Sequence, residues 1–448
     1  MFTKKLYGRW QEIVDKVCDL WLNAEEDIAE HPSPGESGPG NKILSMKHDK
    51  APVALIATMF LTIGVMFCMN DILLPIVKDI FGLDYLQATF IQVSFYIVYI
   101  IWPIPAIRAI EKYGYRRSII GAMLICFAGC LLFVPAYYLT SYALILAGVF
   151  TISTGVTVIN VTANPYASLL GSPDGANVRL NFVQAFSRIG YAATPLVSSM
   201  LIFSQGSQQP RIHTPYLVLA LLIAMVVILM KVFRMPDHTP SAAESISVPK
   251  ILAKSRNYRQ LFYGVPAMFF YVGAEACTAG FFISYMTTHS FSHEMAATFL
   301  TFYYIFAASF ALIGTVLLRV VPASTLLGIF GVGMLTCFTL VVWGPASVAP
   351  YALIAAGGFL SIMFPTIFGL AIEGLNGFTE KGSALLNFAI VGGAVFPPIQ
   401  GIIADNHGIN LSYLIPAVCI LVVTTYGFSI TSRREKKRRR QASQVPPA

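Results

Sequence analysis

Charged residues are scarce in this 448-residue chain: 30 Lys and Arg plus 22 Asp and Glu make 12% of the sequence, against about 25% in an ordinary soluble protein. Three segments hold 32 of the 52 charges, with 16 in residues 1–50, 8 in 231–259 and 8 in 432–448. The other 352 residues share only 20. They cannot form the charged surface of a soluble domain, which excludes a soluble enzyme and a nucleic-acid-binding domain.

Other chemical signatures are missing too. The sequence contains no G-x-x-x-x-G-K-[ST] phosphate loop, so ATP-driven transport has no support. Its seven cysteines have no disulfide or metal spacing. His289 and His293 have the i, i+4 spacing of a metal pair, but they flank a short Ser-rich loop with no further ligand nearby. We therefore expect no metal, no cofactor and no enzymatic activity.

Long apolar runs fill the space between the charged segments. A membrane-spanning helix needs about 20 mostly apolar residues, because lipid offers no partners to backbone N–H and C=O groups. Twelve runs meet this criterion. They lie near 51–80, 85–110, 118–138, 141–170, 180–204, 214–234, 259–288, 294–319, 323–343, 347–373, 381–404 and 410–431. The sequence therefore predicts an all-α, multi-pass integral membrane protein with twelve transmembrane helices.

The charged central segment divides these helices into two sets of six. The predicted organisation is an N-terminal arm (1–50), a first half (51–234), a central loop (235–258), a second half (259–431) and a basic tail (432–448). The arm is either an amphipathic surface helix or a frayed segment, followed by a Pro- and Gly-rich linker. Short sequence echoes recur at offsets of 200 and 206 residues, which indicates a duplication. Two six-helix halves are the plan of the major facilitator fold.

Basic residues are concentrated in alternate loops. They precede the first helix, follow the second, and fill the central loop and the tail, whereas the opposite loops offer only Lys78 and Arg211. The positive-inside rule then predicts that both termini and the central loop are cytoplasmic. We expect the tail to contact anionic lipid headgroups rather than nucleic acid.

Only three charged residues lie well inside the predicted spans: Asp71, Arg188 and Glu275. Each costs roughly 2.5–3.5 kcal/mol at a helix centre on insertion scales, so each should face a cavity or a partner. Asp71 and Glu275 differ by 204 positions, within the duplication offset, and should therefore face each other between the halves. A desolvated carboxyl group that gains and loses a proton is what a proton-coupled transporter needs. The alternative is a structural charge pair with Arg188.

Several motifs together resemble the fucose/galactose/glucose:proton symporters of the major facilitator superfamily. The matching residues cover nearly all of 51–431. They are Asn70-Asp71-Ile72-Leu73-Leu74-Pro75, Ile91-Gln92, Phe95-Tyr96, Pro103-Ile104-Pro105, Ala163-Asn164-Pro165-Tyr166, Arg179-Leu180-Asn181 with Gln184 and Phe186, Tyr271-Val272-Gly273-Ala274-Glu275, Phe364-Pro365-Thr366-Ile367-Phe368 and Gly392-Gly393.

The resemblance implies proton-coupled hexose transport, with Asp71 matching the family's helix 1 acid and Glu275 typical of glucose- and galactose-type members. It also implies sugar contacts, because amides both donate to and accept from hydroxyl groups. The implied substrate-binding residues are Gln92, Asn160, Asn181, Gln184, Phe364 and Asn387. Asn181 and Gln184 share one helix face and have the alternative role of bridging helices. Arg188 departs from the family pattern and is expected to be the charge partner of an acid.

The segment from Glu111 to Arg117 is a degenerate copy of the superfamily's acidic and basic loop between helices 2 and 3. It predicts a cytoplasmic gate formed by Glu111, Lys112 and Arg116. The alternative interpretation makes these residues topology anchors only.

The first hypothesis is thus a monomeric sugar symporter of the plasma membrane, which works by alternating access and uses H⁺, or Na⁺, as coupling ion. It would import a hexose or deoxyhexose such as glucose, galactose or fucose. The second keeps the fold and reverses the direction, as a proton-coupled exporter of a small metabolite. The third is a non-transporting sugar sensor that signals through the arm and tail.

Overall fold

The computed structural model describes residues 50–169, 176–202, 210–232, 259–318, 320–373, 375 and 379–442. Every regular element in these ranges is an α-helix. The first half contains α2 (Lys50–Phe81), α3 (Tyr85–Ala88), α4 (Phe90–Tyr96), α5 (Val98–Ile101), α6 (Pro103–Tyr138), α7 (Tyr142–Leu169), α8 (Ala176–Ile202) and α9 (His213–Val232). The second half contains α11 (Arg259–Gly280), α12 (Phe282–Thr288), α13 (His293–Leu317), α14 (Ala323–Trp343), α15 (Ala349–Leu360), α16 (Met363–Ile372), α17 (Thr379–Ala389), α18 (Gly392–His407), α19 (Ile409–Ser412) and α20 (Leu414–Ala442).

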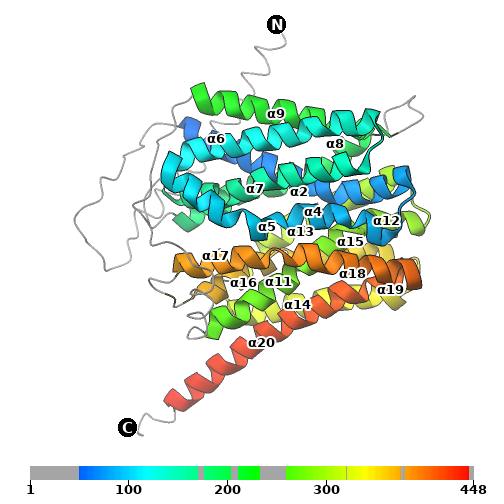
Figure 1. Cartoon of the computed structure of the whole chain (residues 1–448). Helices are drawn as coiled ribbons and strands as arrows, with labels where there is room; N and C mark the ends of the chain where they lie inside the picture. Colours follow the sequence, from blue (N-terminus) through cyan, green and yellow to red (C-terminus); the bar gives the residue numbers. More distant parts are fainter. Residues whose placement is uncertain are drawn as a thin grey trace.

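The helices run roughly parallel in one bundle (Figure 1), with most of the first half stacked on one side and the second half on the other. The end of α20 leaves the bundle on the left of the figure, where α11 also begins, and we call this side the tail end. The opposite side, which contains α3, α12 and α19, is the far end. Between the halves, α8 packs against α13, and α18 packs against α3 and α4.

Helices occur in all twelve ranges that the sequence predicts. Within the described residues, nine helices are long and apolar enough to cross a membrane, or ten if the bent pair α11 and α12 counts as one span. The all-helical fold is therefore confirmed, whereas the full count of twelve crossings stays a prediction. Two predicted spans are missing from this count: 85–110, which is broken into α3, α4, α5 and the start of α6, and 180–204, which corresponds to α8.

The helix α6 joins two predicted spans without a loop. It runs for 36 residues, but Gly114 inside it has φ 77° and ψ 170°. A residue with a side chain rarely adopts a positive φ, whereas glycine has no side chain and adopts it readily, so the helix is kinked at this position. The gate loop predicted around residues 111–117 is thus a kink at a single glycine between two long helices.

Several spans of the second half are also interrupted, and two of the interruptions bear on the site. The bend between α11 and α12 is 41° and falls at Phe281. The span that begins with α15 breaks at Ser361 and Ile362 before α16 continues it. Pro365 lies four residues after Ser361 and has no N–H, so the Ser361 carbonyl lacks its usual helical donor. Interrupted helices at membrane depth expose backbone groups that other side chains then bind.

A close crossing of α2 and α8 fixes the core of the first half. Cβ atoms built on Gly64 and Gly190 would collide with the backbone carbonyl oxygens of Ser187 and Leu61, respectively. The second half repeats this arrangement, because a Cβ on Gly392 of α18 would collide with the Phe269 carbonyl of α11. Small residues let membrane helices approach closely, which is the geometry of both crossings. The repeat is consistent with the predicted duplication.

Three predicted segments fall largely outside the described residues. These are the N-terminal arm (1–50, of which only Lys50 is described), the central loop (235–258) and the last residues of the tail (443–448). The first part of the tail continues α20 as a helix to Ala442.

The α2–α8 crossing can be tested with a matched pair of glycine substitutions. Gly64→Ala should lower the free energy of unfolding by about 1–3 kcal/mol, because the added methyl group forces the two helix backbones apart. Gly121→Ala is the control, since a Cβ there meets nothing within 4 Å. Thermal unfolding in detergent should give a lower Tm for the first variant only. Equal Tm values for both variants would contradict the close crossing.

Candidate functional site

Asp71 lies on α2 at the boundary between the two halves and is 6% exposed. Its Oδ2 atom accepts a hydrogen bond of 3.0 Å from the Tyr304 hydroxyl of α13. Its Oδ1 atom accepts a bond of 3.3 Å from Nε2 of Gln92 on α4. The carboxyl group is therefore buried, and both of its oxygen atoms accept hydrogen bonds. It lies on α2 of the first half, and its donors come from α4 of the first half and α13 of the second.

Gln92 holds this carboxyl group in place. The side chain is fully buried, and its Oε1 atom accepts a 2.6 Å hydrogen bond from Nδ2 of Asn70. Gly280, at the end of α11, leaves the necessary room, because a Cβ there would lie 2.7 Å from Nε2 of Gln92. The amide that the sequence predicts to bind sugar is thus directed at Asp71 and Asn70 in this structure.

Glu275 lies on α11 and is half-buried. Its carboxyl group interacts with the Tyr271 side chain one turn earlier on the same helix and with the charge of Arg188 on α8. The charges of Asp71 and Glu275 also act on each other. Electrostatic interactions therefore link the three predicted intramembrane charges between the halves.

Arg188 makes a contact that the sequence does not predict. One Nη atom donates a 3.2 Å hydrogen bond to the Ser361 carbonyl oxygen at the break between α15 and α16. This carbonyl is the one that Pro365 leaves without a helical donor. Arg188 thus connects a helix of the first half to the interrupted span of the second half.

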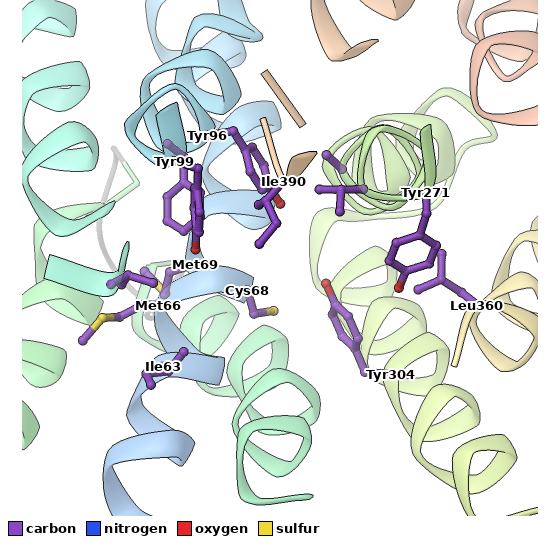
Figure 2. Close-up of a cluster of buried hydrophobic side chains, with 14 of the residues drawn as sticks. Ile63, Met66, Cys68, Met69, Tyr96, Tyr99, Tyr271, Tyr304, Leu360 and Ile390 are labelled. Atoms are coloured by element: carbon purple, nitrogen blue, oxygen red, sulfur yellow. The ribbon is translucent and has the colours of Figure 1, made fainter. Parts of the chain in front are cut away.

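Aromatic side chains surround these polar groups. Figure 2 shows Tyr96, Tyr99 and Cys68 on the side of the first half, with Tyr271 and Tyr304 opposite them. The Tyr304 and Tyr191 rings lie 5.1 Å apart, and the Tyr271 ring lies 6.1 Å from Phe364. Such walls combine apolar ring faces with hydroxyl groups, which suits a ligand that has both kinds of surface.

The predicted sugar ligands are distributed over both halves. Nδ2 of Asn160 donates a 3.0 Å hydrogen bond to the Tyr99 hydroxyl. Asn160, Phe364 and Asn387 are half-buried, and Gln184 is exposed. Asn181 lies on α8, but its side chain is outside the described part of the chain. Through its hydrogen bond Asn160 contacts Tyr99, one of the aromatic residues that Figure 2 shows.

Two of the predicted gate residues, Lys112 and Arg116, have contacts within the first half. Nη2 of Arg116 donates to the carbonyl oxygens of Met230 (3.1 Å) and Lys231 (3.4 Å), at the end of α9. A cation at a helix C-terminus binds carbonyl groups that have no helical donor. Glu111 and Lys112 are exposed, and the Lys112 ammonium lies 5.1 Å from the Tyr113 ring centre. A gate role for these three residues stays a prediction.

A contact between the halves at the far end was missed by the sequence reasoning. Asp405, at the end of α18, accepts hydrogen bonds from the backbone N–H groups of Tyr85 (2.8 Å) and Leu86 (2.9 Å) at the start of α3. The Tyr85 ring stacks on Phe281, with centres 5.7 Å apart. His293 of α13 lies 3.4 Å from Asp79 of α2. The far end is therefore held closed by contacts between the two halves.

Sequence signals for the missed residues are weak. Asp405 is a charge at a predicted helix end, where charges are ordinary, and Tyr304 is one of 21 tyrosines. The best signal is Pro365, because a proline inside an apolar span marks the carbonyl four residues earlier as a free acceptor. That signal identifies Ser361 but not its donor.

Comparison with known proteins shows which family has this fold. Residues 53–390 match the family model of the Major Facilitator Superfamily. The glucose/galactose transporter of Brucella abortus is 33% identical over 392 residues, which cover 86% of this chain and 95% of the relative. The L-fucose–proton symporter of Escherichia coli is 30% identical over 408 residues, which cover 83% and 91%.

A solved structure gives the same result. The crystal structure of a Major Facilitator Superfamily transporter, FucP, in the outward conformation matches with a TM-score of 0.66 and 28% identity, over 84% of this chain and 97% of that one. The helical fold, the family match and the near full-length relatives lead to one conclusion. This chain is a membrane transporter of the Major Facilitator Superfamily and belongs to the group that includes the glucose/galactose transporters and the L-fucose–proton symporters.

Proposed function

We propose that this protein is a proton-coupled sugar symporter that imports a hexose or deoxyhexose by alternating access. The observation that carries the proposal is Asp71, a buried carboxyl group bonded to Tyr304 of the opposite half. Relatives named as glucose/galactose transporters and L-fucose–proton symporters support the substrate class. When the halves separate, the hydrogen bond between Asp71 and Tyr304 breaks and water enters. The surroundings of the Asp71 carboxyl group therefore depend on the separation of the halves.

The coupling ion that this site fits best is H⁺. The side-chain groups bonded to Asp71 are an amide and a hydroxyl, both neutral donors. Desolvation favours the uncharged form of an acid, so proton binding allows the carboxyl group to be buried between the halves. Glu275, which interacts with the charge of Arg188, is the second candidate.

For the sugar, Asn160 and the surrounding tyrosines provide the most suitable described surface. Asn160 is half-buried and lies beside Tyr99, so its amide can exchange a protein partner for a sugar hydroxyl. The rings of Tyr271 and Phe364 supply apolar faces from the other half. Asn181, Gln184 and Asn387 remain part of the proposed sugar site.

Alternating access requires contacts between the halves that form at one end and break in the other state. The Asp405 contacts close the far end in this structure, whereas the related FucP crystal structure is in the outward conformation. If the far end faces outward, the two structures represent the two states of one cycle. We further propose that the protein is a monomer in the plasma membrane bilayer, with both termini cytoplasmic, as the distribution of basic residues predicts.

Proton coupling predicts the behaviour of Asp71→Asn. Purified protein in liposomes should take up labelled glucose, galactose or fucose faster when the outside is acidic, and the variant should lose this acceleration. Its amide can still bond Tyr304 and Gln92 but cannot carry the proton, so exchange of sugar without a gradient should continue. Glu275→Gln, measured alongside, identifies the coupling acid. Uptake by the unmodified protein that ignores the gradient would disprove the coupling.

The sugar site predicts a selective effect of Asn160→Ala. Loss of one hydrogen bond between neutral groups costs about 0.5–1.5 kcal/mol, so the KM for the transported sugar should rise by up to about tenfold. Thr151→Ala is the control on the same helix, since its hydroxyl bonds only the Ala147 carbonyl of its own helix. An unchanged KM in Asn160→Ala would remove this residue from the site.

The far-end contact predicts a conformational effect of Asp405→Ala. Spin labels at Leu139 and Val348, two exposed residues at the far end of opposite halves, report the separation. Removal of both acceptor oxygens should increase the population with a long distance between the labels. The neighbouring substitution Asn406→Ala should leave the distances unchanged, because that side chain bonds only its own helix. A distance distribution insensitive to Asp405 would show that other contacts close this end.

A further inference from the structure

The bond between Arg188 and Ser361 lies at mid-depth and joins the two halves. Arg188 is 12 residues from the start of α8, which begins at the tail end, and Ser361 is 12 residues from the start of α15, which begins at the far end. At 1.5 Å per residue both are about 18 Å from their own end of the bundle. Because α8 and α15 run from opposite ends, the two positions meet near the centre.

The Ser361 carbonyl can accept this hydrogen bond because of Pro365. In an uninterrupted helix the Ser361 carbonyl would bind the N–H of residue 365, but that residue is Pro365. Helical bonding resumes at the next position, where Thr366 N–H donates to the Ile362 carbonyl at 3.1 Å. One carbonyl at the break therefore lacks its helical donor, and the Arg188 guanidinium donates to it.

Arg188 has a second partner within electrostatic range, the carboxyl group of Glu275. Glu275 interacts electrostatically with ionisable groups on five helices, α2, α4, α8, α11 and α13. They are Asp71, Tyr96, Arg188, Tyr191, Tyr271 and Tyr303. Among the described residues, Arg188 is the one cation in that set. An ionised Glu275 therefore attracts the guanidinium, and a protonated Glu275 does not.

We propose that Arg188 is a positioning residue of the transport cycle: it holds the halves together by binding the Ser361 carbonyl while Glu275 is protonated, and turns toward Glu275 when that carboxyl group loses its proton. The proton passes to water admitted between the halves. This role rests on the proposed proton coupling. It adds the residue, Arg188, through which protonation of Glu275 changes the packing of the two halves.

A distance measurement without sugar tests this role. Spin labels at Met200 of α8 and Tyr351 of α15, both exposed, report the separation of the halves. The chain would carry Cys18→Ser, since the other six cysteines are buried. Arg188→Met should lower the ratio of closed to open populations by about tenfold or more, because a hydrogen bond from a charged donor is lost. Glu275→Gln should raise this ratio, because the competing carboxylate is gone.

Pro365→Ala distinguishes a bond to this carbonyl from a general packing role. The substitution returns an N–H to Ser361, so it should lower the closed population in the unmodified protein. In the Arg188→Met background it should have no further effect, since the bond that it displaces is already absent. Arg188→Lys keeps the charge, and it should restore part of the closed population.

Two results would overturn the proposal. One is an unchanged distance distribution in Arg188→Met, and the other is an equal effect of Pro365→Ala with and without Arg188. Failure of the proposed function would look different: labelled sugars would not be taken up by the unmodified protein, while the distances would still respond to Arg188, Glu275 and Pro365. Thermal unfolding of each variant confirms that the protein remains folded.

Discussion

Lipid offers no hydrogen-bond partners to a peptide backbone, and the architecture of this transporter depends on that constraint. Helices satisfy it in every described element. Prolines inside the spans are exceptions, because each removes the helical donor of a carbonyl four residues earlier, and two of these carbonyls belong to residues near the site. Pro75 removes the donor for Asp71 and Pro365 for Ser361. Asp71 belongs to the polar cluster between the halves, and the Ser361 carbonyl bonds Arg188 of the same cluster, so carbonyl groups without a helical donor occur beside intramembrane charges.

Much of the fold could be predicted from hydropathy alone, because a span must be long, apolar and helical. The ranges 51–80 and 323–343 correspond closely to α2 and α14. Prediction was weaker where a helix is interrupted. The segment that starts at Tyr85 breaks three times, and Gly114 replaces a predicted loop by a kink. Such breaks are decided by neighbouring helices, whose positions a local pattern does not contain.

The charged members of the site could also be predicted, since Asp71, Arg188 and Glu275 are rare residues inside apolar runs. Their partners could not, because Tyr304 is 233 positions from Asp71 and Ser361 is 173 positions from Arg188. Gln92 illustrates the limit: the resemblance implied a sugar ligand, and the structure directs its amide at Asp71. A residue type indicates which bonds are chemically suitable, and the tertiary fold selects among them.

The Asp405 contact has a consequence for secondary structure as well as for the closure of the far end. A helix is usually capped by a residue just before it, but the carboxylate that receives the first N–H groups of α3 is 320 positions away, in the other half. Separation of the halves therefore removes a cap from a helix of only four residues. The helix–coil equilibrium of α3 therefore depends on whether the far end is closed or open. Amide hydrogen exchange at Tyr85 and Leu86 reports which of these two states is occupied.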